Sequence, residues 1–99
     1  MKELYLEITY RHGHPIAAYL YLPRASRDRS RRSAKAAAGL VIDFTHRGKP
    51  IGIEITAPSR LTLAAFNRVL RSLDLPALKR AELGPLLPTR PKTGSRGDR

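Results

Sequence analysis

Hydrophobic and polar residues alternate along two stretches of the chain, and a period of two is typical of β-strands. Every second residue is apolar or aromatic in residues 4–10, and the same alternation resumes in residues 16–22. A glycine and a proline stand between the two stretches, so this part of the sequence predicts a β-hairpin. Keeping the apolar residues together pairs Tyr10 with Ile16 and makes Arg11–Pro15 the loop.

A second copy of this pattern follows about 35 residues later, where "HRGKPI" repeats the turn "RHGHPI". Residues 40–45 and 50–56 alternate in the same way, which predicts a second hairpin. The apolar residues stay on one face here when Phe44 is paired with Ile51 and His46–Lys49 form the loop. The repeated turn is therefore an architectural feature, in which glycine reverses the chain and proline opens the returning strand.

After Pro58 the period changes to that of a helix. Leucine and phenylalanine recur at helical spacing in residues 63–73, with Thr62 as a candidate N-cap. The run Asp74–Pro76 ends this helix, and a second short helix is expected in residues 77–83.

Together these elements predict an α+β fold of the type ββββα(α). We expect a four-stranded antiparallel sheet, built from the two hairpins, with one or two C-terminal helices on one face. The pattern leaves open whether the hairpins follow one another in an up-and-down order. We expect residues 1–88 to form one domain with a flexible connection at residues 24–36, and residues 89–99 to be a disordered tail. The pattern leaves open whether residues 33–38 form a strand, a helix or a loop.

The positive charge of the chain is concentrated in these two polar segments. The chain has a formal net charge of +11, yet residues 24–35 alone hold six basic residues and one acidic residue, and residues 89–99 hold four and one. Arginine binds phosphate through its charge and its forked donors, although such runs also serve as solvated linkers. The candidate polyanion-binding residues are Arg24, Arg27, Arg29, Arg31 and Arg32.

Three of the four tyrosines fall on the face of the first hairpin that the helices do not cover. The predicted pairing puts Tyr5 opposite Tyr21 and Glu7 opposite Tyr19. An aromatic sheet face near arginines binds single-stranded nucleic acid in several folds, and it also suits a dimer interface. Tyr5, Tyr19 and Tyr21 are therefore a candidate interaction face.

The histidines raise the question of a metal site. They lie only in the two turns, without an acidic residue or a cysteine at ligand spacing, so we predict no metal site. In an up-and-down sheet the two turns share one end, and they would form a basic rim. Its members are Arg11, His12, His14, His46, Arg47 and Lys49.

No catalytic or cofactor-binding residue is predicted. The chain has no cysteine, which excludes disulfides, thiolate zinc sites and a cysteine nucleophile. Asp43 and Glu54 are diagonal neighbours on the outer face of the second hairpin, and we expect them to form salt bridges. No P-loop, dinucleotide fingerprint or nucleophile elbow occurs. We therefore expect no enzymatic activity and no small-molecule substrate.

The segment "GLVIDFTHRGKPIGIEITAPS" carries a resemblance to a known family. It is similar to the small bacterial proteins of domain-of-unknown-function family number 2283, with their pattern of Gly, three hydrophobic residues, Asp, an aromatic residue and a later GIEI. The matching positions are Gly39, Asp43, Phe44, Gly48, Gly52, Ile53, Glu54, Ile55 and Ser59. The resemblance implies a small, mostly β domain and raises an antitoxin-like role as a hypothesis. This chain has basic residues where the family usually has acidic ones in the second turn, so no acidic site is carried over.

Three functional hypotheses follow, and the last of them, an enzyme or metal protein centred on the histidines, is the one that the sequence supports least. The first is a non-enzymatic protein-interaction module that pairs with itself or with a protein partner. The second is a nucleic-acid-binding protein that uses the arginine-rich connection and the tyrosine face. No segment is apolar enough to span a bilayer, and the absence of cysteine fits a cytoplasmic protein without a membrane partner.

Overall fold

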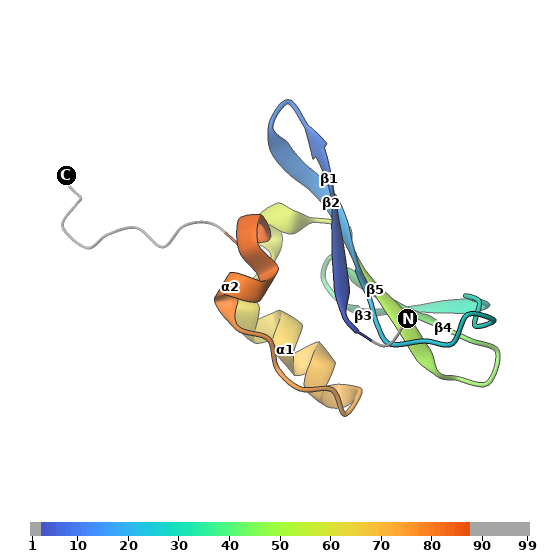
Figure 1. Ribbon diagram of the computed structural model, residues 1–99. Coiled ribbons are helices and arrows are strands. Elements are labelled where there is room, and N and C mark those ends of the chain that lie inside the picture. The colour runs from blue at the N-terminus through green and yellow to red at the C-terminus, as the bar shows by residue number, and fades with distance from the viewer. Residues whose placement is uncertain (1–2, 88–99) are drawn as a thin grey trace, which may run out of the picture.

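The computed structural model describes residues 3–87, which form one antiparallel sheet with helices packed on one of its faces (Figure 1). The predicted tail at residues 89–99 lies outside the described residues. The fold is α+β, but the sheet has five strands where the sequence predicts four. The strands are β1 (Tyr5–Arg11), β2 (His14–Tyr21), β3 (Arg32–Ala37), β4 (Leu40–Phe44) and β5 (Pro50–Ile55). The α-helices are α1 (Leu63–Ser72) and α2 (Arg80–Leu83), and the 3₁₀ turns are η1 (Pro58–Arg60) and η2 (Gly84–Leu86).

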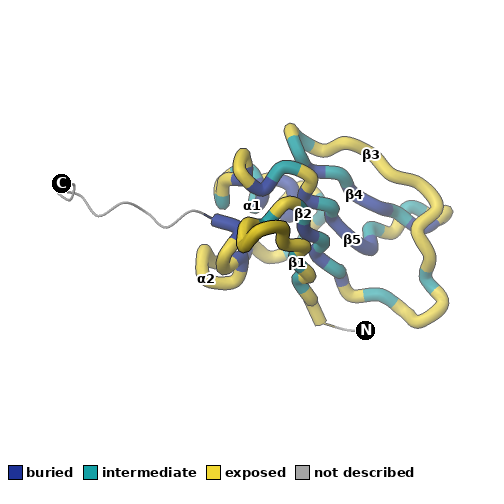
Figure 2. The backbone as a smooth tube through the Cα atoms, turned by 90° about the horizontal axis from the view of Figure 1, so that it is seen from above, coloured by how far each residue is buried: buried dark blue, intermediate teal, exposed yellow. Residues whose placement is uncertain are grey.

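The additional strand, β3, comes from the second half of the basic connection. Its sequence is rich in alanine and polar residues, which favour strands weakly, and pairing with β4 holds it in the sheet. Gly39, whose φ is +75°, closes the tight turn between the two strands. Almost every residue of β3 is exposed (Figure 2). A polar strand of this kind is suited to the edge of a sheet, where one side has no partner strand.

The strand order is β1-β2-β5-β4-β3, which is not the up-and-down order on which the basic rim depends. The most apolar strands are central because they bury side chains against the helices. Leu20 of β2 lies opposite Ile53 of β5, and both are almost fully buried. Because β3 precedes β4 and every pairing is antiparallel, the second hairpin runs in the reverse direction. Its turn therefore lies at the end of the sheet opposite to the turn between β1 and β2 (Figure 1).

Most of the predicted register of the first hairpin is confirmed. Tyr5 pairs with Tyr21 and Glu7 with Tyr19, but a bulge after Thr9 shifts the remaining pairs. Tyr10 therefore pairs with Pro15 rather than Ile16, and the predicted five-residue loop is a two-residue turn, His12–Gly13. Both turn residues have positive φ, as the tight turns of hairpins require. The hairpin is longer than predicted, and its tip extends beyond the helices (Figure 1).

The second hairpin keeps the predicted pairing along its length and departs from it at the turn. Ile42 pairs with Ile53 and Asp43 with Gly52, as the pattern indicates. A register shift then pairs Phe44 with Pro50 instead of Ile51. Ile51 is fully buried all the same, so the bulge does not expose an apolar side chain.

The helices cover the apolar face as predicted. The Thr62 hydroxyl accepts a hydrogen bond from the Ala65 amide at 3.1 Å, which confirms the N-cap, and α1 buries Phe66, Val69 and Leu70. The second helix is shorter than the predicted range 77–83. One reason is that the Leu78 amide donates to the Asn67 side chain, which ties this segment to α1 before α2 begins. No helix among residues 3–87 has the length and apolar character that crossing a membrane requires.

Candidate nucleic-acid interface

The chain between β2 and β3 crosses one end of the sheet, past the turn between β4 and β5. This crossing follows from the strand order, because β5 and β4 lie between the two strands that the segment connects. At its start, the Leu22 amide donates to the Ile51 carbonyl at 3.1 Å, and at its end the Arg31 amide donates to the Phe44 carbonyl at 2.8 Å. The predicted flexible connection at residues 24–36 is therefore partly strand β3 and partly a loop that is anchored at both ends.

A third anchor lies in the middle of this loop. The Lys49 ammonium group donates to the Asp28 carboxylate at 2.6 Å, and the same carboxylate accepts a bond from the Ala25 amide at 2.9 Å. These contacts hold the pKa of Asp28 below its ordinary value, and the hydrogen bond from Lys49 is the largest cause. Asp28 therefore remains ionised at neutral pH, and its charge is matched by that of Lys49.

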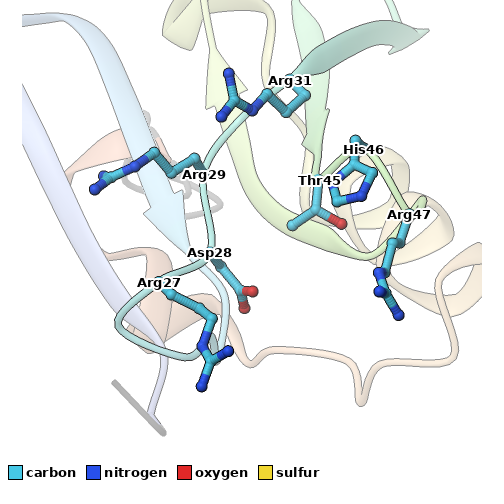
Figure 3. Close-up of a pocket in the computed structure, with 7 residues that line it drawn as sticks. All are labelled: Arg27, Asp28, Arg29, Arg31, Thr45, His46 and Arg47. Atoms are coloured by element: carbon cyan, nitrogen blue, oxygen red, sulfur yellow. The ribbon is translucent and has the colours of Figure 1, made fainter.

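Loop and turn enclose a hollow with a volume of about 450 Å³ (Figure 3). We call it the basic hollow, and its lining residues are Arg27, Asp28, Arg29, Arg31, Thr45, His46 and Arg47. Figure 3 shows the loop residues on one side and the turn residues on the other, with the Asp28 carboxylate directed between them. Four arginines surround a single acid, and that acid already has a lysine partner. The hollow is therefore strongly cationic at neutral pH.

The turn that carries His46 and Arg47 is held by its own hydrogen bonds. The Thr45 amide donates to the Lys49 carbonyl at 2.9 Å, and the Lys49 amide donates to the Thr45 hydroxyl at 3.1 Å. Thr45 is buried, whereas His46 and Arg47 are exposed. The two basic side chains are therefore presented to solvent from a defined backbone.

Only three of the five predicted polyanion-binding arginines line the hollow. Arg27, Arg29 and Arg31 line the hollow. Arg24 instead lies 5.3 Å from the centre of the Tyr21 ring, and Arg32 lies 4.9 Å from that of Phe44. Both are cation–π contacts beside the hollow, outside its lining.

The predicted basic rim is wrong as a single site. Arg11, His12 and His14 lie at the turn between β1 and β2, while His46, Arg47 and Lys49 lie at the opposite end of the sheet. The cause is the additional strand β3, which reverses the direction of the second hairpin. One half of the predicted rim joins the arginine loop, and the three histidines are not brought together.

The open face of the sheet carries the predicted tyrosines in a defined arrangement. The centres of the Tyr5 and Tyr21 rings are 5.7 Å apart, and those of Tyr19 and Tyr21 are 4.6 Å apart. The Tyr21 hydroxyl donates to Glu7 at 3.1 Å, and this hydrogen bond is the main cause of a raised Tyr21 pKa. All three tyrosines share a face, as the sequence predicts, and the hydroxyl groups of Tyr19 and Tyr21 donate to different carboxylates.

A chain of hydrogen bonds crosses the same face. The Tyr19 hydroxyl donates to one oxygen of Asp43 at 2.7 Å, and the Ser33 hydroxyl donates to the other at 2.6 Å. Asp43 is buried, and its carboxylate accepts hydrogen bonds from these two hydroxyl groups, whereas the sequence predicts a salt bridge. The Tyr19 ring lies directly over Gly52, where any side chain would collide with it. Strands β2, β4 and β3 are thereby connected across β5.

This network was not predicted from the sequence, nor was the position of Asp28 and Thr45 in the lining of the hollow. Tyr19 and Asp43 are 24 residues apart, and they approach only because β5 pairs with β2. The one available signal was the predicted position of Asp43 opposite Gly52, which leaves space above the glycine.

The environment of Tyr19 has a measurable consequence at high pH. Burial is the main cause that raises the pKa of Tyr19 to about 12, and the hydrogen bond and charge of Asp43 add to it. Since the unfolded value is about 10, the neutral phenol stabilises the fold fully below pH 10, and this contribution is lost as pH rises through about 12. Wild-type protein should therefore lose stability over this interval more steeply than Tyr19→Phe, as measured by urea unfolding. Parallel curves for the two proteins would contradict the assignment.

Comparison with known proteins identifies no relative. No family model matches the sequence, and neither a curated protein nor a solved structure shows a significant match. The geometry of the described residues therefore carries the functional argument.

Proposed function

We propose that this protein binds nucleic acid and that the basic hollow is its phosphate-binding site. The observation that carries the proposal is the convergence of Arg27, Arg29 and Arg31 from the loop with His46 and Arg47 from the turn. These residues belong to segments separated in sequence, and the fold collects them around one space. A solvated linker would not require anchors at its start, middle and end.

The chemistry of the hollow favours phosphate groups as its ligand. Guanidinium groups donate pairs of hydrogen bonds that match the oxygens of a phosphate, and they remain charged at all physiological pH values. Several arginines along one loop are suited to a ligand with repeated phosphates, because each contact releases a counterion and adds to the affinity. Among residues 3–87 the hollow offers donors and positive charge, with its one carboxylate engaged by Lys49, so we propose a binding role rather than a catalytic one.

The proposal predicts a large loss of affinity when the loop arginines are neutralised. Wild type and a triple variant (Arg27→Gln, Arg29→Gln, Arg31→Gln) would be titrated into a fluorescently labelled oligonucleotide, with anisotropy measured at several salt concentrations. We expect the variant to bind at least about tenfold more weakly near 0.1 M salt. We also expect its slope of log affinity against log salt to fall by about two units, for three lost contacts on a single strand.

A matched control distinguishes an effect of this site from an effect of the lower net charge of the protein. The triple variant Arg60→Gln, Arg68→Gln and Arg71→Gln removes three exposed arginines of η1 and α1. It has the same net charge as the loop variant and should keep wild-type affinity to within about twofold. Equal losses in the two triple variants, or no binding by wild type, would contradict the proposal.

A specific observation favours protein interaction as a second candidate function. The large hydrophobic side chains that the structure exposes in residues 3–87 all lie on or beside the first hairpin, and they are Leu4, Tyr5, Tyr10 and Ile16. Strand β1 is also an edge of the sheet, so its outer side is suited to pairing with another strand. We propose self-association through this edge as the alternative, and a sedimentation coefficient that rises with protein concentration would support it.

Family membership and an antitoxin-like role stay proposals as well. The resemblance depends in part on Asp43 and Gly52, and these residues lie opposite each other in β4 and β5. The hallmark positions thus belong to one structural unit, in which the glycine leaves room for the tyrosine that binds the aspartate. This arrangement supports the resemblance at the level of fold.

A further inference from the structure

Beside the basic hollow, two tyrosines and an arginine form a second surface on the open face. Tyr5 is 55% exposed and lies 5.7 Å from Tyr21, and Arg24 covers Tyr21 at 5.3 Å. We call these three residues the tyrosine ledge. Planar rings and a guanidinium group at this spacing offer stacking surfaces for planar ligands.

The ledge and the hollow lie at the same end of the sheet. Tyr5 begins β1 and Tyr21 ends β2, so both rings stand at the end of the sheet that the arginine loop crosses. Arg24 belongs to the first part of that loop, and its Nη2 donates to the Ile51 carbonyl at 2.7 Å. Arg24 therefore links the ledge to the loop whose later residues line the hollow.

Charge restricts a polyanion to this end of the open face. In the next row of the sheet Tyr19 lies opposite Glu7 on one side and Glu54 on the other. These carboxylates repel phosphates from the middle of the face. Tyr19 itself is engaged, since its hydroxyl donates to Asp43 and its ring lies over Gly52. Tyr5, which is 55% exposed, is therefore the open ring of the ledge, and Tyr21 lies beside it with its hydroxyl group bound to Glu7 and its ring covered by Arg24.

We propose that the protein prefers single-stranded to double-stranded nucleic acid, with phosphates in the basic hollow and unpaired bases stacked on the tyrosine ledge. This inference rests on the proposed function. Unpaired bases present their faces to aromatic side chains, whereas the bases of a duplex are stacked on one another and are not available to a flat protein surface. The charge of the hollow attracts both single and double strands, whereas the ledge adds affinity for single strands only.

The chain has no tryptophan, which makes a direct test simple. Tyr5→Trp places a unique fluorophore on the ledge, and Tyr10→Trp places one at the other end of the hairpin, where Tyr10 is 51% exposed. Twelve-nucleotide oligothymidylate and oligouridylate would be compared with a twelve-base-pair duplex. We expect both single strands to quench the fluorescence of Tyr5→Trp at saturation, and the fluorescence of Tyr10→Trp to stay unchanged.

Affinity measurements complete the test. Tyr5→Leu should weaken single-strand binding by about fivefold or more, from the loss of one stacked base, with the salt slope unchanged. Its affinity for the duplex should equal that of wild type, and Tyr10→Leu should match wild type for both ligands. This pattern differs from that of the loop arginine variants, which lower the salt slope.

Three outcomes would overturn the inference, and they are distinguishable. If wild type binds no nucleic acid, the proposed function fails together with the inference. If the loop arginines matter but the duplex binds as tightly as the single strands and Tyr5→Trp is not quenched, only the inference fails. If Tyr5→Leu alters the sedimentation coefficient and leaves single-strand affinity unchanged, the ledge is an interface between copies of the chain.

Discussion

Gly52→Ala is expected to destabilise the protein by about 2 kcal/mol, although alanine suits a strand better than glycine. A Cβ atom at this position would overlap the Tyr19 ring and hydroxyl group. The ring must therefore move away, and its hydrogen bond to Asp43 is lost. A buried carboxylate that loses one of its two hydroxyl donors bears a desolvation cost of this size. Urea unfolding of wild type and variant measures the difference.

The physical cause can be isolated with a double-mutant cycle. In a Tyr19→Ala background the obstacle is absent, so Gly52→Ala should cost less than about 0.5 kcal/mol or should stabilise the strand slightly. Tyr19→Phe removes only the hydroxyl group and should by itself cost about 1 to 2 kcal/mol. An equal cost of Gly52→Ala with and without the Tyr19 side chain would show that the network is not the reason for the glycine.

Phe66→Ala is expected to have the largest effect, with a loss of about 3 to 5 kcal/mol. Phe66 is fully buried at the centre of α1, and the core cluster that it joins includes Leu20, Ile53 and Leu83. Its removal leaves a cavity between the sheet and the helices. In a domain of this size, a loss of about 3 to 5 kcal/mol is a large part of the total free energy of unfolding. Urea unfolding followed by circular dichroism should show a midpoint at a lower urea concentration than for wild type.

Two variants keep this prediction measurable. Phe66→Leu retains most of the volume and should cost about 1 to 2 kcal/mol, so it gives a transition even where Phe66→Ala is largely unfolded. Tyr10→Ala removes an aromatic ring of similar size that is 51% exposed, and it should cost less than about 1 kcal/mol. Equal losses at positions 10 and 66 would contradict the assignment of the core.

The hairpins and α1 follow from the sequence because their signals are local. Alternation selects the face of each residue, and a short loop limits the partners that Ile8 or Ile42 can reach, so most cross-strand pairs were predictable. The Thr62 cap and the helical spacing of Phe66 and Leu70 are equally local. The predicted pairs are wrong only at the bulges near the two turns. There a shift of the register by one residue costs little free energy, and the apolar pattern is weak.

Strand β3 had no local signal. Its alanines and charged residues fit a strand, a helix or a loop, and only pairing with β4 makes the segment a strand. This one element changed the predicted site, because it reverses the second hairpin. His46 and Arg47 thereby moved away from His12 and His14 and came to the arginine loop.

The sequence by itself determined the two hairpins, the apolar face that the helices cover, the shared face of the tyrosines and the concentration of charge in one connection. Only the tertiary structure decided which strands are neighbours, and with it the basic hollow and the hydrogen bonds of Asp43. The physical reason is that pairing across a tight turn depends on a few adjacent residues. The meeting of β2 and β5 instead depends on the burial of Leu20 and Ile53 against a helix formed later in the chain.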